Sequence, residues 1–101
     1  MPTVAEVCQH IRSKNAGPFW ITIDLFFPDR ERFDAYSESP ALQAAALARL
    51  FGVEERHVKR HAVPRLAVLK ISYPRQVPQG GALERDMHGG QQFVPLLDVK
   101  L

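Results

Sequence analysis

The sequence FWITIDLFF, residues 19–27, is the most strand-prone stretch of this 101-residue chain. Side chains point alternately to the two sides of a strand, so every second residue shares a face. One face is wholly apolar and consists of Phe19, Ile21, Ile23, Leu25 and Phe27. The other face is mixed, with Asp24 near its middle. The pattern predicts a central strand whose second side meets a helix, a partner or a site. A buried Asp24 would need an Arg or Lys partner, whereas an exposed one would be a polar edge residue.

The segment before this strand has the features of a helix. Thr3 and Glu6 have the spacing of a capping box, in which each side chain accepts a hydrogen bond from the other residue's backbone. Apolar residues then recur at helical intervals, at Val4, Val7, Cys8 and Ile11. The run NAGP at residues 15–18 suits a left-handed cap followed by a proline that cannot continue the helix. We therefore expect a helix that begins after Thr3 and has Lys14 in its last turn.

The segments after the strand predict two more helices and three more strands. Asp29 is placed to cap a short helix that runs through Tyr36. Residues 41–51 are rich in Ala and Leu, and Gly52 ends the helix that they predict. Beyond it we expect strands over residues 58–63 and 66–73, a loop over 74–92 and a final strand over 93–101.

Together these elements indicate the fold class. A strand, a helical crossover and another strand favour parallel placement, and the two strands over 58–73 add an antiparallel hairpin. We expect one α+β domain over residues 1–101, a two-layer sandwich with a roughly four-stranded mixed sheet and helices on one face. A domain of this length buries only a modest core. A partner or a homo-oligomer is therefore expected to complete it.

Charge and composition exclude several classes of protein. The chain has 13 Lys and Arg against 11 Asp and Glu, and its net charge of +2 is too weak for the basic stripe of a nucleic-acid-binding protein. It has no run of about 18 apolar residues that could cross a membrane. Cys8 is the one cysteine, which fits a reducing compartment. With no readable signal peptide, we expect a cytoplasmic protein.

No cofactor or metal is expected. The sequence has no glycine fingerprint for binding phosphate. His57 and His61 alone do not complete a coordination shell. Cys8 lies on an apolar stripe and is most simply a small core residue.

The loop ERDMHGGQQ, residues 84–92, holds the densest set of polar side chains. Asp86 and His88 have the chemistry of an acid/base pair. Arg85 has the geometry to hold a carboxylate or phosphate through two hydrogen bonds. The alternative is a glycine-rich surface loop that bonds to itself or packs on a neighbouring subunit.

The turn RSKNAGP, residues 12–18, is the second candidate. Its cations and the amide of Asn15 could cradle an anion, although the C-terminus of a helix has the wrong dipole for this. The structural alternative is a left-handed cap, which accounts for both Asn15 and Gly17.

Two regions resemble a known family: RSKNAGPFWITIDLFF at residues 12–27, and YPRQVPQG with ERDMHGGQQFVPLLDVKL at residues 73–80 and 84–101. The family comprises small bacterial and fungal domains of unknown function (domain of unknown function 4387), found beside or fused to AtuA-like proteins of the acyclic terpene utilisation group. The resemblance covers nearly the whole chain. Its motif residues here are Asn15, Gly17, Arg85, Asp86, Gly89, Gln91 and Gln92. Met87 and His88 stand where the family has an aliphatic and an aromatic residue.

The resemblance implies a partner and leaves the reaction open. We expect an accessory subunit that docks on a larger AtuA-like subunit in the catabolism of organic acids or acyl compounds. Its expected ligand- or partner-binding residues are Asn15, Gly17, Arg75, Arg85, Gln91 and Gln92. The alternative is a small lyase or isomerase that uses Asp86 and His88 at a subunit boundary. A further alternative is a plain homo-oligomer whose sheet edge pairs across a two-fold axis.

Overall fold

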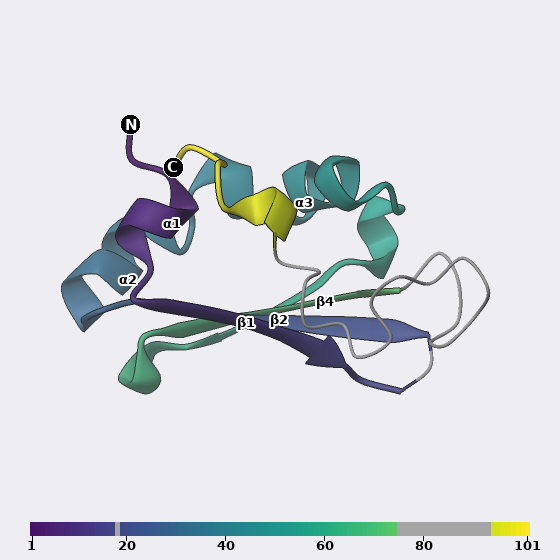
Figure 1. Ribbon diagram of the computed structural model, residues 1–101, viewed down its shortest axis with the longest axis horizontal. Helices are drawn as coiled ribbons and strands as arrows, with labels where there is room; N and C mark the ends of the chain where they lie inside the picture. The colour runs from purple at the N-terminus through teal and green to yellow at the C-terminus, as the bar shows by residue number, and fades with distance from the viewer. Residues whose placement is uncertain (18, 75–93) are drawn as a thin grey trace.

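Strand β2 (Trp20–Phe26) is an inner strand of a four-stranded sheet with the order β1-β2-β4-β3. The computed structural model describes residues 1–17, 19–74 and 94–101. The other strands are β1 (His10–Asn15), β3 (Lys59–Val63) and β4 (Val68–Pro74). Figure 1 shows the helices gathered on one side of this sheet. The expected α+β class, with four strands and helices on one face, is therefore confirmed.

The sheet is antiparallel throughout, so the expectation of a mixed sheet is wrong. Each of the three strand pairs, β1 with β2, β2 with β4, and β3 with β4, is antiparallel. The helical crossover does bring β3 back parallel to β2, as expected. However, β4 lies between them and pairs with both, so no parallel ladder forms.

The helix layer follows the local signals of the sequence. It contains α1 (Val4–Val7), α2 (Arg30–Tyr36) and α3 (Ala44–Phe51), with the short 3-10 helices η1 (Pro40–Leu42), η2 (Glu55–His57) and η4 (Val94–Leu96). A further 3-10 helix, η3 (Pro64–Leu66), connects β3 to β4 at the end of the sheet, on the side away from this layer (Figure 1). The Asp29 side chain accepts a hydrogen bond from the Arg32 amide at 2.8 Å and caps α2 as predicted. Gly52 ends α3 in the left-handed conformation with φ 69°.

The predicted first helix is only partly correct. The capping box is present, since the Glu6 amide donates to Thr3 Oγ1 at 3.2 Å and the Thr3 amide donates to Glu6 Oε1 at 3.0 Å. The helix nevertheless ends at Val7, and residues 10–15 form β1. Its six residues pair with β2 in continuous register. The edge of β2 offers hydrogen bonds along that whole length, and this tertiary pairing outweighs the helical spacing of the apolar residues.

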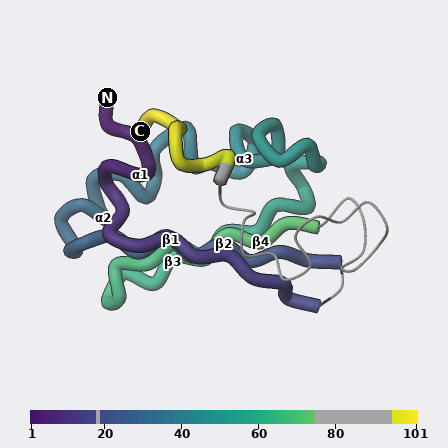
Figure 2. The backbone as a smooth tube through the Cα atoms, in the orientation of Figure 1, coloured from purple at the N-terminus to yellow at the C-terminus, as the bar shows by residue number. Residues whose placement is uncertain are grey.

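The predicted strand over residues 93–101 is also wrong where the structure describes it. Residues 94–96 form η4, and Lys100 makes an isolated bridge to Thr3. The Val4 amide donates to the Val99 carbonyl at 2.8 Å, and the Leu101 amide donates to the Pro2 carbonyl at 2.8 Å. The C-terminal segment thus pairs with the N-terminal one within the helix layer, and the two ends lie side by side (Figure 2). The loop expected over 74–92 lies outside the described residues after Pro74.

The core lies between the sheet and the helix layer. The sheet contributes Ile21, Ile23, Leu25, Leu69 and Ile71, all fully buried, and the other layer contributes Val4, Leu42, Leu47 and Leu96. Phe51 of α3 stacks on Tyr73 of β4 with ring centroids 4.2 Å apart. Phe19, expected on the apolar face, is 55% exposed because it precedes β2 at the turn. One side of the sheet is thus a packed core, and no described α-helix lies over the other.

Candidate functional site on the uncovered face of the sheet

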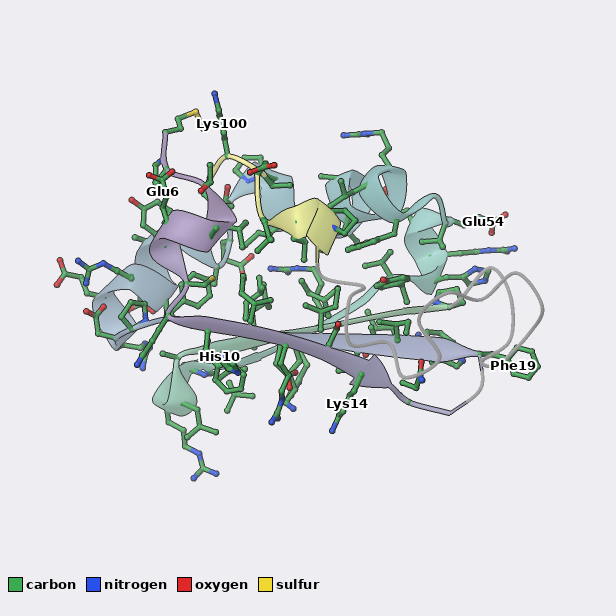
Figure 3. The ribbon with its side chains drawn as sticks, viewed as in Figure 1. Glu6, His10, Lys14, Phe19, Glu54 and Lys100 are labelled. Carbon is green, nitrogen blue, oxygen red and sulfur yellow. The ribbon has the colours of Figure 1, made fainter. Side chains whose placement is uncertain are left out.

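The face of the sheet that points away from the α-helices has a net positive charge. We call it the uncovered face and define it by three rows that the strand register places across the sheet. The rows are Lys14, Thr22, Ser72 and Lys59; then Arg12, Asp24, Lys70 and His61; then His10, Phe26, Val68 and Val63. His10 and Lys14 extend from β1 on the side opposite the helices (Figure 3).

The middle row is centred on a buried carboxylate. Asp24 is 1% exposed. A guanidinium nitrogen of Arg12 lies 3.3 Å from its Oδ2, and the Lys70 ammonium lies 3.5 Å from its Oδ1. A buried charge requires counterions, and the two neighbouring strands supply them. The conditional prediction from the sequence, that a buried Asp24 would need an Arg or Lys partner, is confirmed.

Arg12 is held by a second contact. Its guanidinium lies 5.5 Å from the centre of the Phe26 ring, within the range of a cation–π interaction. The His10 ring packs against the same Phe26 with centroids 5.5 Å apart. Asp24 and Phe26 together therefore fix the position of the Arg12 head group on the face.

The first row has a different character. Thr22 Oγ1 and Ser72 Oγ lie 3.3 Å apart at its centre and share a hydrogen bond. Lys14 and Lys59 stand at its two ends, both exposed, and neither forms an ion pair with a described residue. These two ammonium groups are therefore available to an anion from outside.

The net positive charge of the uncovered face is larger than that of the whole chain. Its three rows hold four permanent cations (Arg12, Lys14, Lys59 and Lys70) against one carboxylate, a net charge of +3 with the histidines neutral. The complete chain has a net charge of only +2, so everything else sums to −1. Such a concentration of positive charge attracts acidic groups.

A hollow opens at the end of the uncovered face nearest the turn between β1 and β2. It has a volume of about 320 Å³, and its described lining comprises Ala16, Trp20, Lys59 and Ser72. Lys59 and Ser72 stand opposite each other in the register of β3 and β4. The hollow thus joins a cation and a hydroxyl to an aromatic wall.

The residues predicted from the sequence fall elsewhere. Asn15 is the last residue of β1, half-buried and opposite Ile21, so it belongs to the helix-covered side. Gly17 has φ +91°, and a Cβ there would meet nothing within 4 Å. The turn between two strands thus requires glycine for its backbone, and the expected helix cap at Asn15 and Gly17 does not form. The remaining candidates lie outside the described residues: Arg75, Arg85, Asp86, His88, Gln91 and Gln92.

Two observations concern the nucleophilic and metal-binding capacity of the described residues. Burial raises the pKa of the Cys8 thiol to about 12, so Cys8 is protonated at neutral pH and is a poor nucleophile. Within residues 1–17, 19–74 and 94–101, no three His, Cys, Asp or Glu side chains gather in a way that could hold a metal ion. In that same part of the chain no helix is long and apolar enough to cross a bilayer.

Comparison with known proteins places the chain in a family. Residues 4–100 match the model of a domain of unknown function, DUF4387. The chain belongs to the DUF4387 family. No curated protein and no solved structure matches it. The membership expected from the two sequence regions is thus confirmed, and the DUF4387 domain assigns no reaction.

Reasoning from the sequence missed the uncovered face of this DUF4387 domain. A signal was present, because His10, Arg12 and Lys14 alternate with the uncharged Ile11, Ser13 and Asn15 in the manner of a strand with one basic side. The apolar residues Val4, Val7, Cys8 and Ile11 have helical spacing, so the sequence predicted a helix over residues 10–14 instead of a strand. Without β1, the sequence could not place Arg12 beside Asp24 or Lys14 beside Thr22.

Proposed function

We propose that this DUF4387 domain is a non-catalytic accessory subunit that docks, through its uncovered face, on a larger AtuA-like subunit in the catabolism of organic acids or acyl compounds. The carrying observation is the net charge of +3 on a sheet face over which no described α-helix lies. The identity of the partner rests on the family resemblance, and the mode of docking rests on the charge of this face.

The charge favours a different protein over a second copy on this face. Two copies pairing their uncovered faces would set Lys and Arg against Lys and Arg, and like charges across an interface are costly. A partner with Asp and Glu at the matching positions would gain from the same cations. Self-association through another surface stays a prediction, which light scattering tests.

The state of the described acidic and nucleophilic groups supports a non-catalytic role. Asp24 is buried between two cations, and Cys8 is protonated at neutral pH. Neither is placed to exchange protons with, or attack, a substrate. The lyase or isomerase alternative depends on Asp86 and His88 and stays a prediction. It would be supported if Asp86→Asn abolished an activity while the fold survived.

Co-purification with the product of the neighbouring gene, which we expect to be AtuA-like, tests the proposal. The variant Lys14→Glu/Lys59→Glu reverses two charges on the uncovered face. Its matched control, Arg49→Glu/Lys100→Glu, reverses two exposed charges in the helix layer. We expect the first pair to abolish co-purification and the second to leave it intact, and we expect the association to weaken as salt rises.

Two results would contradict the proposal. One is a monodisperse small protein that never associates with the neighbouring gene product. The other is equal loss of association in both double variants, which would show that the uncovered face has no special role.

A further inference from the structure

The hollow beside Trp20 has a chemistry separate from the middle row of the uncovered face. Arg12 and Lys70 are already paired with Asp24. Lys59, by contrast, forms no ion pair with any residue that the structure describes, and it lines the hollow together with Ser72. We propose that this hollow binds a small organic carboxylate.

Lys59 and Ser72 form the polar side of the hollow, and together they can bind both oxygens of a carboxylate. The Lys59 ammonium supplies charge and hydrogen-bond donors. The Thr22 and Ser72 hydroxyls share one hydrogen bond, which uses one of their two protons. When Thr22 is the donor of that bond, the Ser72 O–H group is left to donate to a ligand in the hollow. One ammonium and one hydroxyl match the two oxygens of a single carboxylate better than the three terminal oxygens of a phosphate.

The apolar wall accommodates the carbon part of the ligand. Ala16 and the half-buried Trp20 form this side of the hollow. The hollow is open to solvent, and its volume of about 320 Å³ is at the lower end of the range of ligand pockets, which suits a short-chain acid. The ligand is thus expected to place its carboxylate on Lys59 and Ser72 and its hydrocarbon chain against the indole.

This inference does not depend on the docking proposal, since the hollow belongs to the DUF4387 domain alone. If the domain does dock through its uncovered face, the partner would close over the open side of the hollow. A ligand held there would then lie at the boundary between the two subunits. The two proposals are tested separately, because ligand binding is measured without the partner.

Trp20 is the one tryptophan of the chain, so its fluorescence reports directly on the hollow. The isolated full chain is titrated with acetate, butyrate and hexanoate at constant ionic strength, and with butyramide and inorganic phosphate for comparison. We expect a saturable change with the carboxylates, with affinity that rises with chain length because more apolar surface is buried. We expect none with butyramide and a weaker effect with phosphate.

Variants separate a built site from general attraction by charge. Lys59→Gln is expected to weaken butyrate binding about tenfold, the size of one charge-assisted hydrogen bond. Lys14→Gln is the matched control, because Lys14 carries the same charge on the same face and is not among the described residues that line the hollow. It should change the affinity less than about twofold. Ser72→Ala should also weaken binding, with an unchanged circular dichroism spectrum.

The proposal is overturned by any of three results. The carboxylates produce no saturable change; butyramide or phosphate binds as tightly as butyrate; or Lys14→Gln weakens binding as much as Lys59→Gln does. The last result would show diffuse attraction to the charged face. Both lysines are exposed, so neither substitution is expected to disturb folding.

Discussion

Arg12 and Asp24 stand opposite each other on neighbouring strands, with a guanidinium nitrogen 3.3 Å from the carboxylate. The Asp24 side chain is 2% exposed, whereas that of Arg12 is 55% exposed. The carboxylate has therefore lost its water, and the cation has kept part of its own. Lys70 approaches Asp24 from the other neighbouring strand, and like Arg12 it is partly exposed to solvent. Removing both cations should therefore lower the free energy of unfolding more than their own exposure to solvent suggests.

Arg12→Gln and Lys70→Gln are each expected to lower the free energy of unfolding by only about 1 kcal/mol, since the remaining cation still balances Asp24 and both partners are half in water. The double variant leaves the buried carboxylate without a counterion and should cost about 3 kcal/mol, more than the sum. Urea denaturation measures all three. Adding Asp24→Asn to the double variant should restore most of the loss. Additive single effects with no rescue would show that Asp24 does not depend on these cations.

Gly17→Ala is expected to destabilise the protein by about 1–2 kcal/mol, the cost of a positive φ for a residue with a side chain. The loss is conformational, because a Cβ at this position meets no atom within 4 Å. Gly17→Asn should cost less, since Asn tolerates positive φ. Thermal or urea unfolding measures both. If Gly17→Ala retained full stability and lost association with the partner, Gly17 would be a contact residue as the family motif suggested.

The stability of the protein is expected to fall in alkaline solution because of Cys8. Its thiol pKa is raised by burial from 9.0 to about 12 in the folded protein. Above about pH 9 the unfolded chain therefore loses this proton while the folded chain keeps it, and the free energy of unfolding decreases as pH rises towards 12. Urea unfolding of the wild type and Cys8→Ala at about pH 8 and pH 10.5 tests this. The variant should show the smaller decrease, and equal decreases would refute the assignment to Cys8.

Phe51→Ala should lower the free energy of unfolding by about 2 kcal/mol, less than for a fully buried Phe because Phe51 is half-buried. The lost contact is its stacking on Tyr73, which joins α3 to the sheet. Leu50→Ala is the control, since Leu50 is the preceding residue of the same helix and is exposed. It should change stability by less than about 0.5 kcal/mol in the same denaturation experiment. A similar loss in both variants would show that the stacking of Phe51 on Tyr73 has no special role in stability.

Local signals were sufficient for four parts of the fold. The alternation in FWITIDLFF predicted β2, and Asp29 and Gly52 marked the start of α2 and the end of α3. The hairpin of β3 and β4 was predicted from two runs joined at Pro64 and Arg65, the second of which alternates apolar residues. In each case the deciding interaction is a cap, a turn or a face within a few residues, so the sequence carries it directly.

The candidate site was much less accessible to sequence reasoning. Asp24 was recognised as a residue that would need a partner if buried, but Arg12 and Lys70 lie on other strands and were not identified as that partner. Lys59 and Ser72 come from the two strands of one hairpin, and Trp20 from a third strand. Only the strand register shows that they line one hollow.

The sequence by itself determined the class of this DUF4387 domain, its central strand and the caps of its helices. Tertiary structure determined the secondary structure of residues 10–15 and of the C-terminal segment. Helix propensities differ by only a few tenths of a kcal/mol per residue. A segment therefore forms a strand when an unpaired sheet edge offers it a complete ladder of hydrogen bonds. The edge of β2 made residues 10–15 into β1, which brought Arg12 to Asp24 and Lys14 to the uncovered face. The charged face on which the functional proposal rests therefore exists because of a long-range pairing.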